Sequence, residues 1–424
     1  MADNVSSGEP RWSDDTFDLL LDEAREGAAE RERRRDLPHD LVRRLTAAGF
    51  SSARVPAEAG GEGVTLEELF DRLVRLAAAD SSVAHLFRGH LAFVEQQHLD
   101  VDVDRRSRWY ARVLQGDLVG NAQSEVSGTS DLSTTLTGCL APDGSGDLRL
   151  DGRKYYTTGT LYADWIDLSA VSSAHGDRPV QLFVRTDAEG VEVVDDWAGF
   201  GQQLTGSGTT TFTHVAVDPA DVRSDPEEAG RHAYLMGFFQ LVLLAVVAGI
   251  GRAAVDDAVA FVRPRSRIFG HAGVSLPRED PLVQSVVGGL SATASAARAV
   301  VLQCARELDA GLALHLRTRA SDGTSSPKAL EALVAAQLEV YKAQQVVLPM
   351  VVGATSELFE VGGASSVDLG RALDRHWRNA RTVATHNPAV QRRRAIGDFE
   401  LNGTAPVFSP SPDAPGSQHG GRAT

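Results

Sequence analysis

The sequence predicts an α+β protein, mostly α, with an N-terminal helical domain, a central β-barrel or β-sandwich domain and a C-terminal four-helix bundle. Apolar residues recur at helical spacing up to about residue 118 and again beyond residue 220, whereas short alternating runs broken by Gly, Asp and Ser lie between. We therefore expect domains at residues 1–118, 119–220 and 221–403. The Pro, Ser and Gly-rich tail over 404–424 is expected to be disordered.

The individual elements follow from local patterns. Helical periodicity in the first domain predicts helices over 14–35, 38–48, 66–79 and 82–98, with a Gly-rich extended crossing at 56–63. Alternating runs in the central domain predict strands within 148–159, 180–186, 191–197 and 209–218. Long helical stretches are expected in the last domain, over 231–263, 280–309, 327–361 and 369–385.

One of these helices is apolar enough to raise the question of a membrane span. Residues 234–251 are nearly all apolar and approach the length that crosses a bilayer. Gln240 and three glycines interrupt the run. A helix that is apolar all round also fits the centre of a large helical bundle, which is the interpretation we favour.

Charge and cysteine content limit the class of partner. The net charge of -15 argues against a nucleic-acid or anionic-membrane surface, because both require clustered positive charge. A small-molecule partner is expected instead. Cys139 and Cys304 lie far apart without the spacing of a disulfide framework or a metal site, so we expect neither. The polar N-terminus lacks the features of an export signal, and a reducing cytoplasm is the expected location.

Common nucleotide and protease motifs are absent from the sequence. It contains neither a phosphate-binding P-loop nor a zinc-protease HExxH motif. The nearest match to a dinucleotide fingerprint, around Gly249 and Gly251, lies inside the long apolar helix with no strand before it. No NAD(P)H site is therefore predicted.

Four segments carry polar and aromatic side chains suited to a planar cofactor. Residues 123–131 read QSEVSGTSD, and residues 152–159 read GRKYYTTG. In the second run Tyr156 offers an aromatic plane and Thr158 a hydroxyl, which together could cover and hydrogen-bond a planar ring. The third segment, 199–217, contains Thr205, Ser207 and Thr209, and the fourth, 374–388, reads DRHWRNARTVATHNP.

Together these segments resemble the acyl-CoA dehydrogenase superfamily over about residues 18–403. The fourth is similar to a subfamily of reduced-flavin monooxygenases that includes the dibenzothiophene monooxygenases and the sulfur-acquisition oxidoreductases. The resemblance implies that the flavin and its phosphate contact a set of residues comprising Ser124, Ser130, Tyr156, Thr158, Gly159, Arg265, Arg267 and Arg378. Alternatively, Arg378 organises the helix turn beneath His386 together with Asn379 and Arg381.

Both places where dehydrogenases of this superfamily carry their catalytic base lack a carboxylate. Thr385 and His386 stand at one of them, and Phe239 and Gln240 stand at the other. Removal of the α-proton of a thioester needs a positioned base within hydrogen-bond reach. The dehydrogenase reaction is therefore disfavoured, although Glu357 and Glu360 remain candidate bases.

The resemblance instead implies oxygen chemistry. A C4a-hydroperoxyflavin survives only where water is excluded and a hydrogen-bond donor meets its oxygens. His386 is the expected catalytic donor, Thr158 supports the adduct from the opposite side, and His90 is expected to line the substrate pocket. Val94 stands where the dibenzothiophene enzyme has a Tyr, which argues against an aromatic sulfide. His85 is expected to point elsewhere.

The sequence thus predicts a two-component monooxygenase. It would take reduced FMN, or alternatively FAD, from a separate NAD(P)H:flavin reductase and use O2 to oxidise a small organic substrate at sulfur, nitrogen or carbon. Two alternatives remain: an FAD-dependent acyl-CoA dehydrogenase-like oxidoreductase, and a non-catalytic flavin-binding paralogue. The resemblance also implies a homotetramer.

Overall fold

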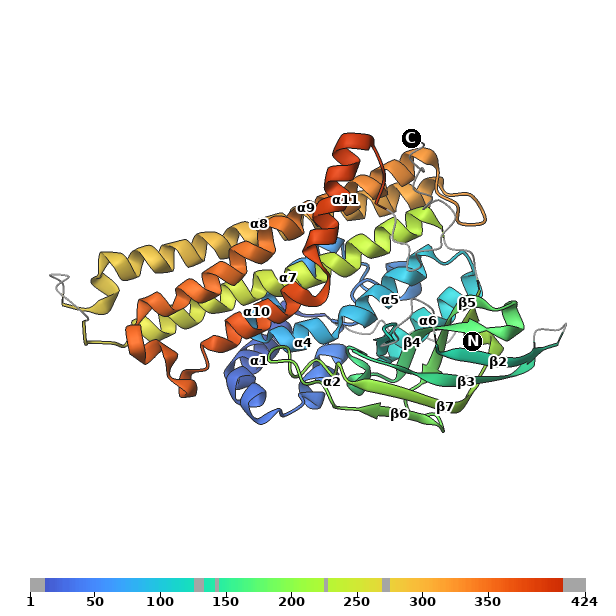
Figure 1. The fold of residues 1–424 in the computed structure, drawn as a ribbon, viewed down its shortest axis with the longest axis horizontal. Helices are drawn as coiled ribbons and strands as arrows, with labels where there is room; N and C mark the ends of the chain where they lie inside the picture. The colour runs from blue at the N-terminus through green and yellow to red at the C-terminus, as the bar shows by residue number, and fades with distance from the viewer. Residues whose placement is uncertain (1–11, 126–132, 142–144, 225–227, 269–274, 407–424) are drawn as a thin grey trace, which may run out of the picture.

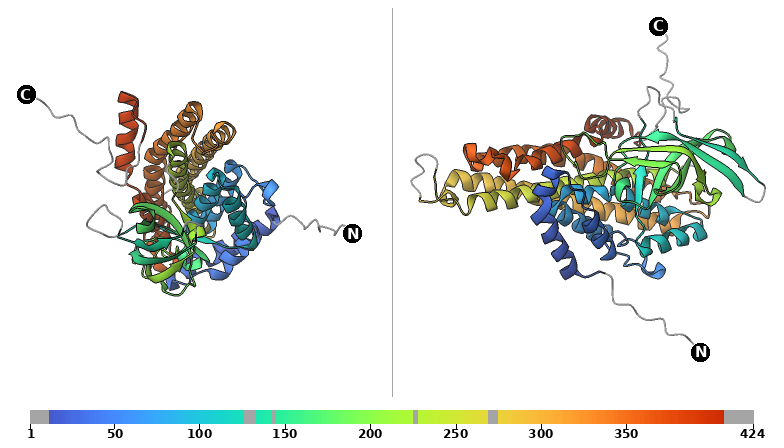
Figure 2. Two further views of the ribbon diagram at one scale, coloured as in Figure 1. Left: turned by 90° about the vertical axis from the view of Figure 1, so that its right-hand side faces the viewer. Right: turned by 90° about the horizontal axis from the view of Figure 1, so that it is seen from below.

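The computed structural model describes residues 12–125, 133–141, 145–224, 228–268 and 275–406. Within the described residues, helices come first and last along the chain and a single sheet lies between them, which confirms the predicted fold class (Figure 1). The sheet and the N-terminal helices lie side by side against one side of the C-terminal bundle, whose far end projects beyond them (Figure 2).

The N-terminal region contains six α-helices among its described residues: α1 (Asp14–Arg34), α2 (His39–Ala47), α3 (Leu66–Ala79), α4 (Ser81–Leu86), α5 (Arg88–Leu99) and α6 (Val103–Gln115). Thr65 and Glu68 begin α3 with a reciprocal capping box. The helix expected over 82–98 is two helices, because the backbone of Phe87, with ψ near -7°, departs from helical geometry. This break affects which side chains of α4 and α5 face the same way.

The central region is one curled sheet rather than two stacked ones. Its strands are β1 (Val119–Ala122), β2 (Thr135–Leu140), β3 (Gly146–Lys154), β4 (Trp165–Ser172), β5 (Arg178–Arg185), β6 (Val191–Val194), β7 (Thr209–Val217) and β8 (Val222–Arg223). The order is β6-β7-β3-β2-β4-β5-β8, and β1 pairs in parallel with β4. An isolated bridge between Ser124 and Tyr155 places the end of β1 beside the turn that follows β3.

The C-terminal region is a helical bundle built around its first helix. Its helices are α7 (Ala229–Val262), α8 (Pro281–Thr318), α9 (Pro327–Glu357), α10 (Asp374–His386) and α11 (Ala389–Asn402). The stretch expected as one helix over 369–385 begins later, and Pro388 separates α10 from α11 because proline cannot continue the backbone ladder.

Two of these helices are long and apolar enough to cross a membrane by length and composition alone, namely α7 and α8. In α7, 89% of the most apolar window is buried inside the protein, where it packs against α3, α8 and α9. The favoured interpretation of residues 234–251 as a core helix is thereby confirmed. In α8 only 28% of that window is buried.

Candidate active site

Two histidines from distant parts of the chain meet where α4 and α10 approach each other. His386 is the last residue of α10, and His85 lies in α4. Their ring centroids are 5.9 Å apart in an edge-to-face arrangement. His85, which the sequence analysis set aside, is therefore the histidine that accompanies His386.

The hydrogen bonds of His85 define its protonation state. Gln202 Nε2 donates to Ser81 Oγ at 3.0 Å, which leaves Gln202 Oε1 to accept from His85 Nδ1 at 2.9 Å. No described residue bonds His85 Nε2, although that atom is buried. Burial lowers the pKa of His85 to about 4, so the ring is neutral near pH 7 and presents Nε2 as an unused acceptor.

A buried network holds Gln202 in place. Its backbone N–H donates to Asn379 Oδ1 at 2.6 Å, and Asn379 Nδ2 donates to Glu32 at 2.8 Å. Gln202 has a φ of 55°, a left-handed conformation that costs energy in a residue with a side chain. The network therefore connects α1 and α10 to the loop that orients His85.

The position of His386 is fixed by the residue that follows it. Asn387 Nδ2 donates to Gln240 Oε1 of α7 at 2.8 Å, and its carbonyl accepts from Gln344 of α9 at 3.2 Å. His386 is exposed at the end of α10, although neighbouring protein atoms withdraw part of its ring from water. Burial, followed by the charge of Arg88, lowers its pKa to about 3. No described carboxylate is among the causes.

His90, by contrast, is a satisfied core residue. Its Nε2 donates to the carbonyl of Ser51 at 3.0 Å, and its Nδ1 accepts from the backbone N–H of Val119 at 3.1 Å. Both ring nitrogens are thus occupied, and only 2% of the side chain is exposed. The structure does not support the pocket role expected for His90. Val94 of the same helix packs in a buried cluster that includes Phe93 and Trp109, and the expectation drawn from its position stays a prediction.

The predicted flavin wall lies in the turn after β3. Thr158 Oγ1 and Ser207 Oγ are 2.8 Å apart, and Ser207 in turn bonds Thr205 at 2.7 Å, all buried. Gly159 has a φ of 82°, and a Cβ there would lie 2.5 Å from the carbonyl oxygen of Leu86. Only glycine allows this close approach. It places the turn that contains Thr158 next to the end of α4, the helix in which His85 lies.

Tyr156 is exposed although it is aromatic. Its φ of 57° turns the side chain out of the strand, 58% of it is solvent-accessible, and its ring lies edge-on to Trp197 with centroids 5.8 Å apart. An exposed aromatic face in a strained backbone conformation is consistent with a surface that a planar ligand covers.

The loop at 123–131 is described only in part. Ser124 is exposed and its carbonyl accepts from Tyr155 N–H at 2.9 Å, whereas Ser130 lies outside the described residues. Glu125 forms an ion pair with the buried Lys154 of β3 and also accepts from Ser133 at 2.6 Å. Glu125 therefore links the described residues before and after the gap, Glu125 and Ser133, to each other and to β3.

The predicted phosphate arginines are not gathered at the histidines. Arg378 already bonds Asp374, Glu32 and the carbonyl of Phe200, which supports the alternative that it organises α10. Arg265 follows α7 and donates to Ser365 at 2.9 Å, and Arg267 is exposed. The 1.5 Å rise per helical residue puts the end of α7 roughly 35 Å from Phe239. Arg265 and Arg267 therefore lie at the projecting tip of the bundle, away from His386 of the same chain.

The candidate dehydrogenase bases are also distant. Glu357 and Glu360 are exposed at the end of α9. Glu357 lies 13 positions beyond Gln344, which contacts Asn387, and this separation corresponds to about 20 Å along the helix. Neither carboxylate reaches the histidine pair.

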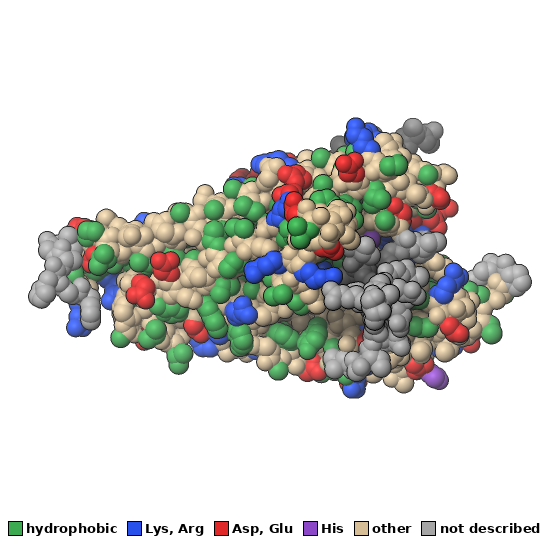
Figure 3. Space-filling model, turned by 45° about the horizontal axis from the view of Figure 1, so that its top comes forward, with side chains coloured by type: hydrophobic (Ala, Val, Ile, Leu, Met, Phe, Trp, Pro, Cys, Tyr) green, Lys and Arg blue, Asp and Glu red, His purple; other side chains and the backbone are tan. Residues whose placement is uncertain are grey.

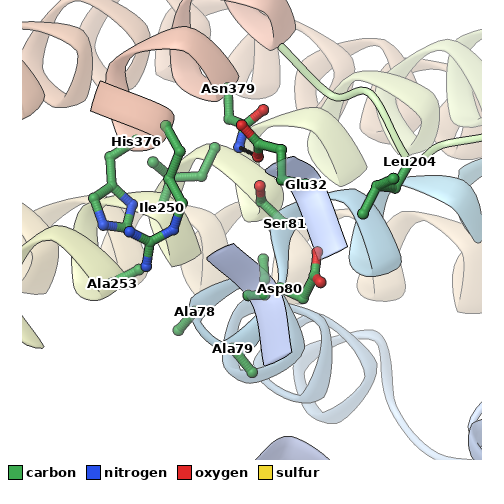
Figure 4. A pocket seen from close by; sticks show the side chains of 13 residues that line it. Glu32, Ala78, Ala79, Asp80, Ser81, Leu204, Ile250, Ala253, His376 and Asn379 are labelled. Carbon is green, nitrogen blue, oxygen red and sulfur yellow. Dashed lines mark hydrogen bonds between the residues drawn. The ribbon is translucent and has the colours of Figure 1, made fainter. Parts of the chain in front are cut away.

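A small hollow lies beside the supporting network. It is lined mainly by α1, the α3–α4 junction and α10, and Figure 4 shows Glu32 and Asn379 facing each other across from His376. Its acidic groups are already used, since Glu32 bonds Asn379 and Asp80 pairs with Arg31. On the face shown in Figure 3, acidic and basic side chains are interspersed, so that face has no continuous basic patch. Among the described residues, no group of three or more potential ligands is placed to bind a metal ion.

The comparison with known families agrees with this geometry. Residues 12–117 match the acyl-CoA dehydrogenase N-terminal domain, and residues 241–391 match the acyl-CoA dehydrogenase C-terminal domain. The chain belongs to the acyl-CoA dehydrogenase superfamily.

Sequence relatives and solved structures indicate a narrower group within this superfamily. Dibenzothiophene monooxygenase of Rhodococcus qingshengii is 29% identical over 92% of this chain and 93% of its own length. A probable FMNH2-dependent monooxygenase, SfnC of Pseudomonas putida, is 26% identical over 90% and 93%. The crystal structure of FMN-bound TdsC from a Paenibacillus species superposes with a TM-score of 0.82 at 28% identity and covers 93% of this chain and 98% of that one. The chain is a flavin-dependent monooxygenase of this superfamily.

Proposed function

We propose that this enzyme oxygenates a small organic substrate with reduced FMN and O2, through a C4a-hydroperoxide, and that His386 and His85 form its catalytic pair. The observation that carries the proposal is the neutral pair itself: two histidines in contact, one with an unused buried acceptor, and no described carboxylate beside them. A dehydrogenase would require a base at this place. An oxygenase requires polar groups in a site that excludes water.

The residues present suit a flavin. The hydroxyl chain of Thr158, Ser207 and Thr205, the close-packed turn at Gly159 and the exposed ring of Tyr156 together offer hydrogen-bonding groups and an aromatic face. Ser124 would hold the pyrimidine side. Bound reduced FMN would supply the electrons that reduce one atom of O2 to water while the other enters the substrate.

Within that site, each histidine has a different task. His85 Nδ1–H is committed to Gln202, so its Nε2 can accept a proton or hydrogen bond. His386 is held by its neighbours but uses neither ring nitrogen in a strong bond, since its Nδ1 lies 3.4 Å from Asn387 Oδ1. His386 can therefore donate to an oxygen atom while His85 accepts from it, as proton transfer requires.

The remaining assignments complete the proposal. One sequence relative, described as a probable FMNH2-dependent monooxygenase, supports reduced FMN rather than FAD, and a separate NAD(P)H:flavin reductase as its source. Arg265 and Arg267 could reach a flavin phosphate only from a neighbouring subunit, and α8 presents a largely unburied apolar face, in keeping with a homotetramer. We place the enzyme in the cytoplasm. The atom that is oxygenated is sulfur, nitrogen or carbon.

Rapid-mixing spectroscopy tests the proposal. Protein loaded with anaerobically reduced FMN is mixed with oxygenated buffer, and we expect a transient absorbance band before the oxidised flavin spectrum returns. His386→Asn should shorten the life of this transient. His214→Asn is the matched control, because His214 is an exposed histidine of β7 bonded only to Asp151 in the described structure.

Two other results would replace the proposal. Immediate reoxidation without a transient, together with tight FAD binding and bleaching by an acyl-CoA, would establish the dehydrogenase. A flavin-bound protein that neither forms the transient nor turns over would be a non-catalytic paralogue.

A further inference from the structure

Arg88, the first residue of α5, carries a positive charge into the interior beside the histidine pair. Its guanidinium carbon lies 4.7 Å from the ring centroid of Phe239, and its Nε donates to the Phe239 carbonyl at 3.2 Å. These contacts use one N–H and one face of the guanidinium. The terminal N–H groups, which form the fork that binds anions, have no described partner.

This arginine differs from other interior arginines because no acidic residue in the described part of the chain pairs with it. Arg31 pairs with Asp80, Arg54 with Glu95, and Arg72 with Glu62, each within 2.8 Å. No described carboxylate pairs with Arg88, and burial lowers its pKa to about 10. It remains charged near pH 7. A charge that is withdrawn from water without a partner is costly, so proteins seldom keep one without a ligand or a function for it.

Several contacts place Arg88 within the proposed active site. Its charge is among the causes that lower the pKa of both His85 and His386. Phe239, on which it rests, precedes Gln240, whose side chain accepts from Asn387 directly after His386. Arg88 also lies three positions after His85, across the break at Phe87. The guanidinium and the two imidazoles therefore border the same space.

We propose that Arg88 binds an anionic group of the substrate, so that this enzyme acts on small organic anions, such as sulfinates, sulfonates or carboxylates, rather than on uncharged aromatic sulfides. The inference rests on the proposed function for the identity of the site. A planar guanidinium binds such groups through two parallel hydrogen bonds. The rest of the substrate then extends from Arg88 toward His85 and His386, and Phe239 provides an apolar surface beside it.

The residue after Arg88 packs closely against the sheet. A Cβ at Gly89 would lie 2.6 Å from Cβ of Asn121 in β1, a separation that only glycine permits. This close packing fixes the start of α5 and with it the backbone that carries Arg88. The FMN phosphate is a second possible anion, and the experiment must distinguish it from the substrate.

Calorimetric titration with matched probes tests the inference without turnover. Benzenesulfinate is compared with methyl phenyl sulfone, and benzoate with benzamide, on the FMN-loaded oxidised enzyme. Hydrogen bonds to a charged group predict that each anion binds about 10-fold to 100-fold more tightly than its neutral partner. Arg88→Gln should abolish the preference, and Arg88→Lys should retain part of it. Arg317→Gln removes the same charge from an exposed position on α8 and should leave the preference intact.

The second arm compares FMN with riboflavin by quenching of flavin fluorescence. We expect Arg88→Gln to leave the affinity ratio of these two flavins unchanged. If the variant instead weakens FMN alone, Arg88 binds the cofactor phosphate and the inference is wrong. It is also wrong if the wild-type enzyme shows no preference for the anions. That comparison needs no variant, so a misfolded Arg88→Gln would not prevent the decision. Failure of the oxygen transient in the wild type would overturn the proposed function and leave the anion preference standing.

Discussion

Asparagine substitutions at His85 and His90 separate a catalytic from a structural histidine within one short stretch of chain. His85→Asn keeps an amide N–H near the position of Nδ1, so the bond to Gln202 can persist, but it removes the unused acceptor Nε2. His90→Asn keeps an acceptor for Val119 N–H but removes the donor to the Ser51 carbonyl. Both substitutions remove Nε2 of an imidazole. In His85 this atom is the unused acceptor, and in His90 it is the donor to Ser51.

The expected magnitudes follow from these bonds. Losing the acceptor of His85 removes one hydrogen bond to a reacting group, worth about 1.5–3 kcal/mol, so the life of the oxygen transient should fall about 10-fold to 100-fold. Losing the donor of His90 leaves a buried carbonyl unsatisfied, which costs about 1–3 kcal/mol of folding free energy. His85→Asn should change stability less, because its lost nitrogen has no protein partner.

Two quantities are measured on each variant. Rapid mixing with oxygen gives the lifetime of the transient, and unfolding in urea gives the free energy of unfolding. The predicted pattern is a short transient with near-normal stability for His85→Asn, and a normal transient with reduced stability for His90→Asn. The reverse pattern would refute the reasoning, since it would mean that His90 faces the reacting groups. Equal effects of both variants on the transient would refute it as well.

Three further predictions concern the same site and its support. The folded pKa values of His85 and His386, about 4 and about 3, lie below the usual 6.5, so unfolding takes up protons below about pH 6.5. Stability, followed by thermal unfolding, should therefore fall as pH drops toward 4, whereas the transient's lifetime should stay flat from about pH 6 to about pH 8; a step near pH 6.5 would contradict the lowered values. Gln202→Leu should shorten the transient by about tenfold, because His85 loses the acceptor that fixes its tautomer; an unchanged lifetime would show that the tautomer needs no partner. Glu125→Gln should lower the free energy of unfolding by about 3 kcal/mol, because it leaves Lys154 buried and unpaired, and urea unfolding would expose a smaller effect if the lysine finds another partner.

Much of the fold was predictable because its signals are local. The capping box of α3 lies within four consecutive residues, and the apolar run of α7 requires burial whatever surrounds it. Proline at position 388 could have indicated the end of α10. The break at Phe87 has no comparable signal, since neither glycine nor proline is present there and the departure from helical geometry depends on packing.

The site was predictable only where a motif carries it. His386 and Thr158 stand in segments that resemble a known family, and the structure brings the turn that contains Thr158 close to α4, where His85 meets His386. The choice between His85 and His90 depended on partners far away in the sequence. Ser51 and Val119 bond both ring nitrogens of His90, whereas Gln202 orients the ring of His85. Local spacing says which side of a helix a residue faces, but it does not say what lies there.

The charge distribution makes the site unusual within this protein. Acidic residues outnumber basic ones and give a net charge of -15, yet the histidine pair has no described carboxylate beside it and an arginine without a counter-ion. A carboxylate near Arg88 would neutralise it and compete with any anionic ligand, and one near the imidazoles would raise their pKa values and favour their charged forms. Keeping acids away therefore serves both purposes at once: the histidines stay neutral for proton transfer, and the guanidinium stays available for a substrate anion. The same exclusion removes the base that a dehydrogenase would need, so oxygenation and anion binding share one electrostatic cause.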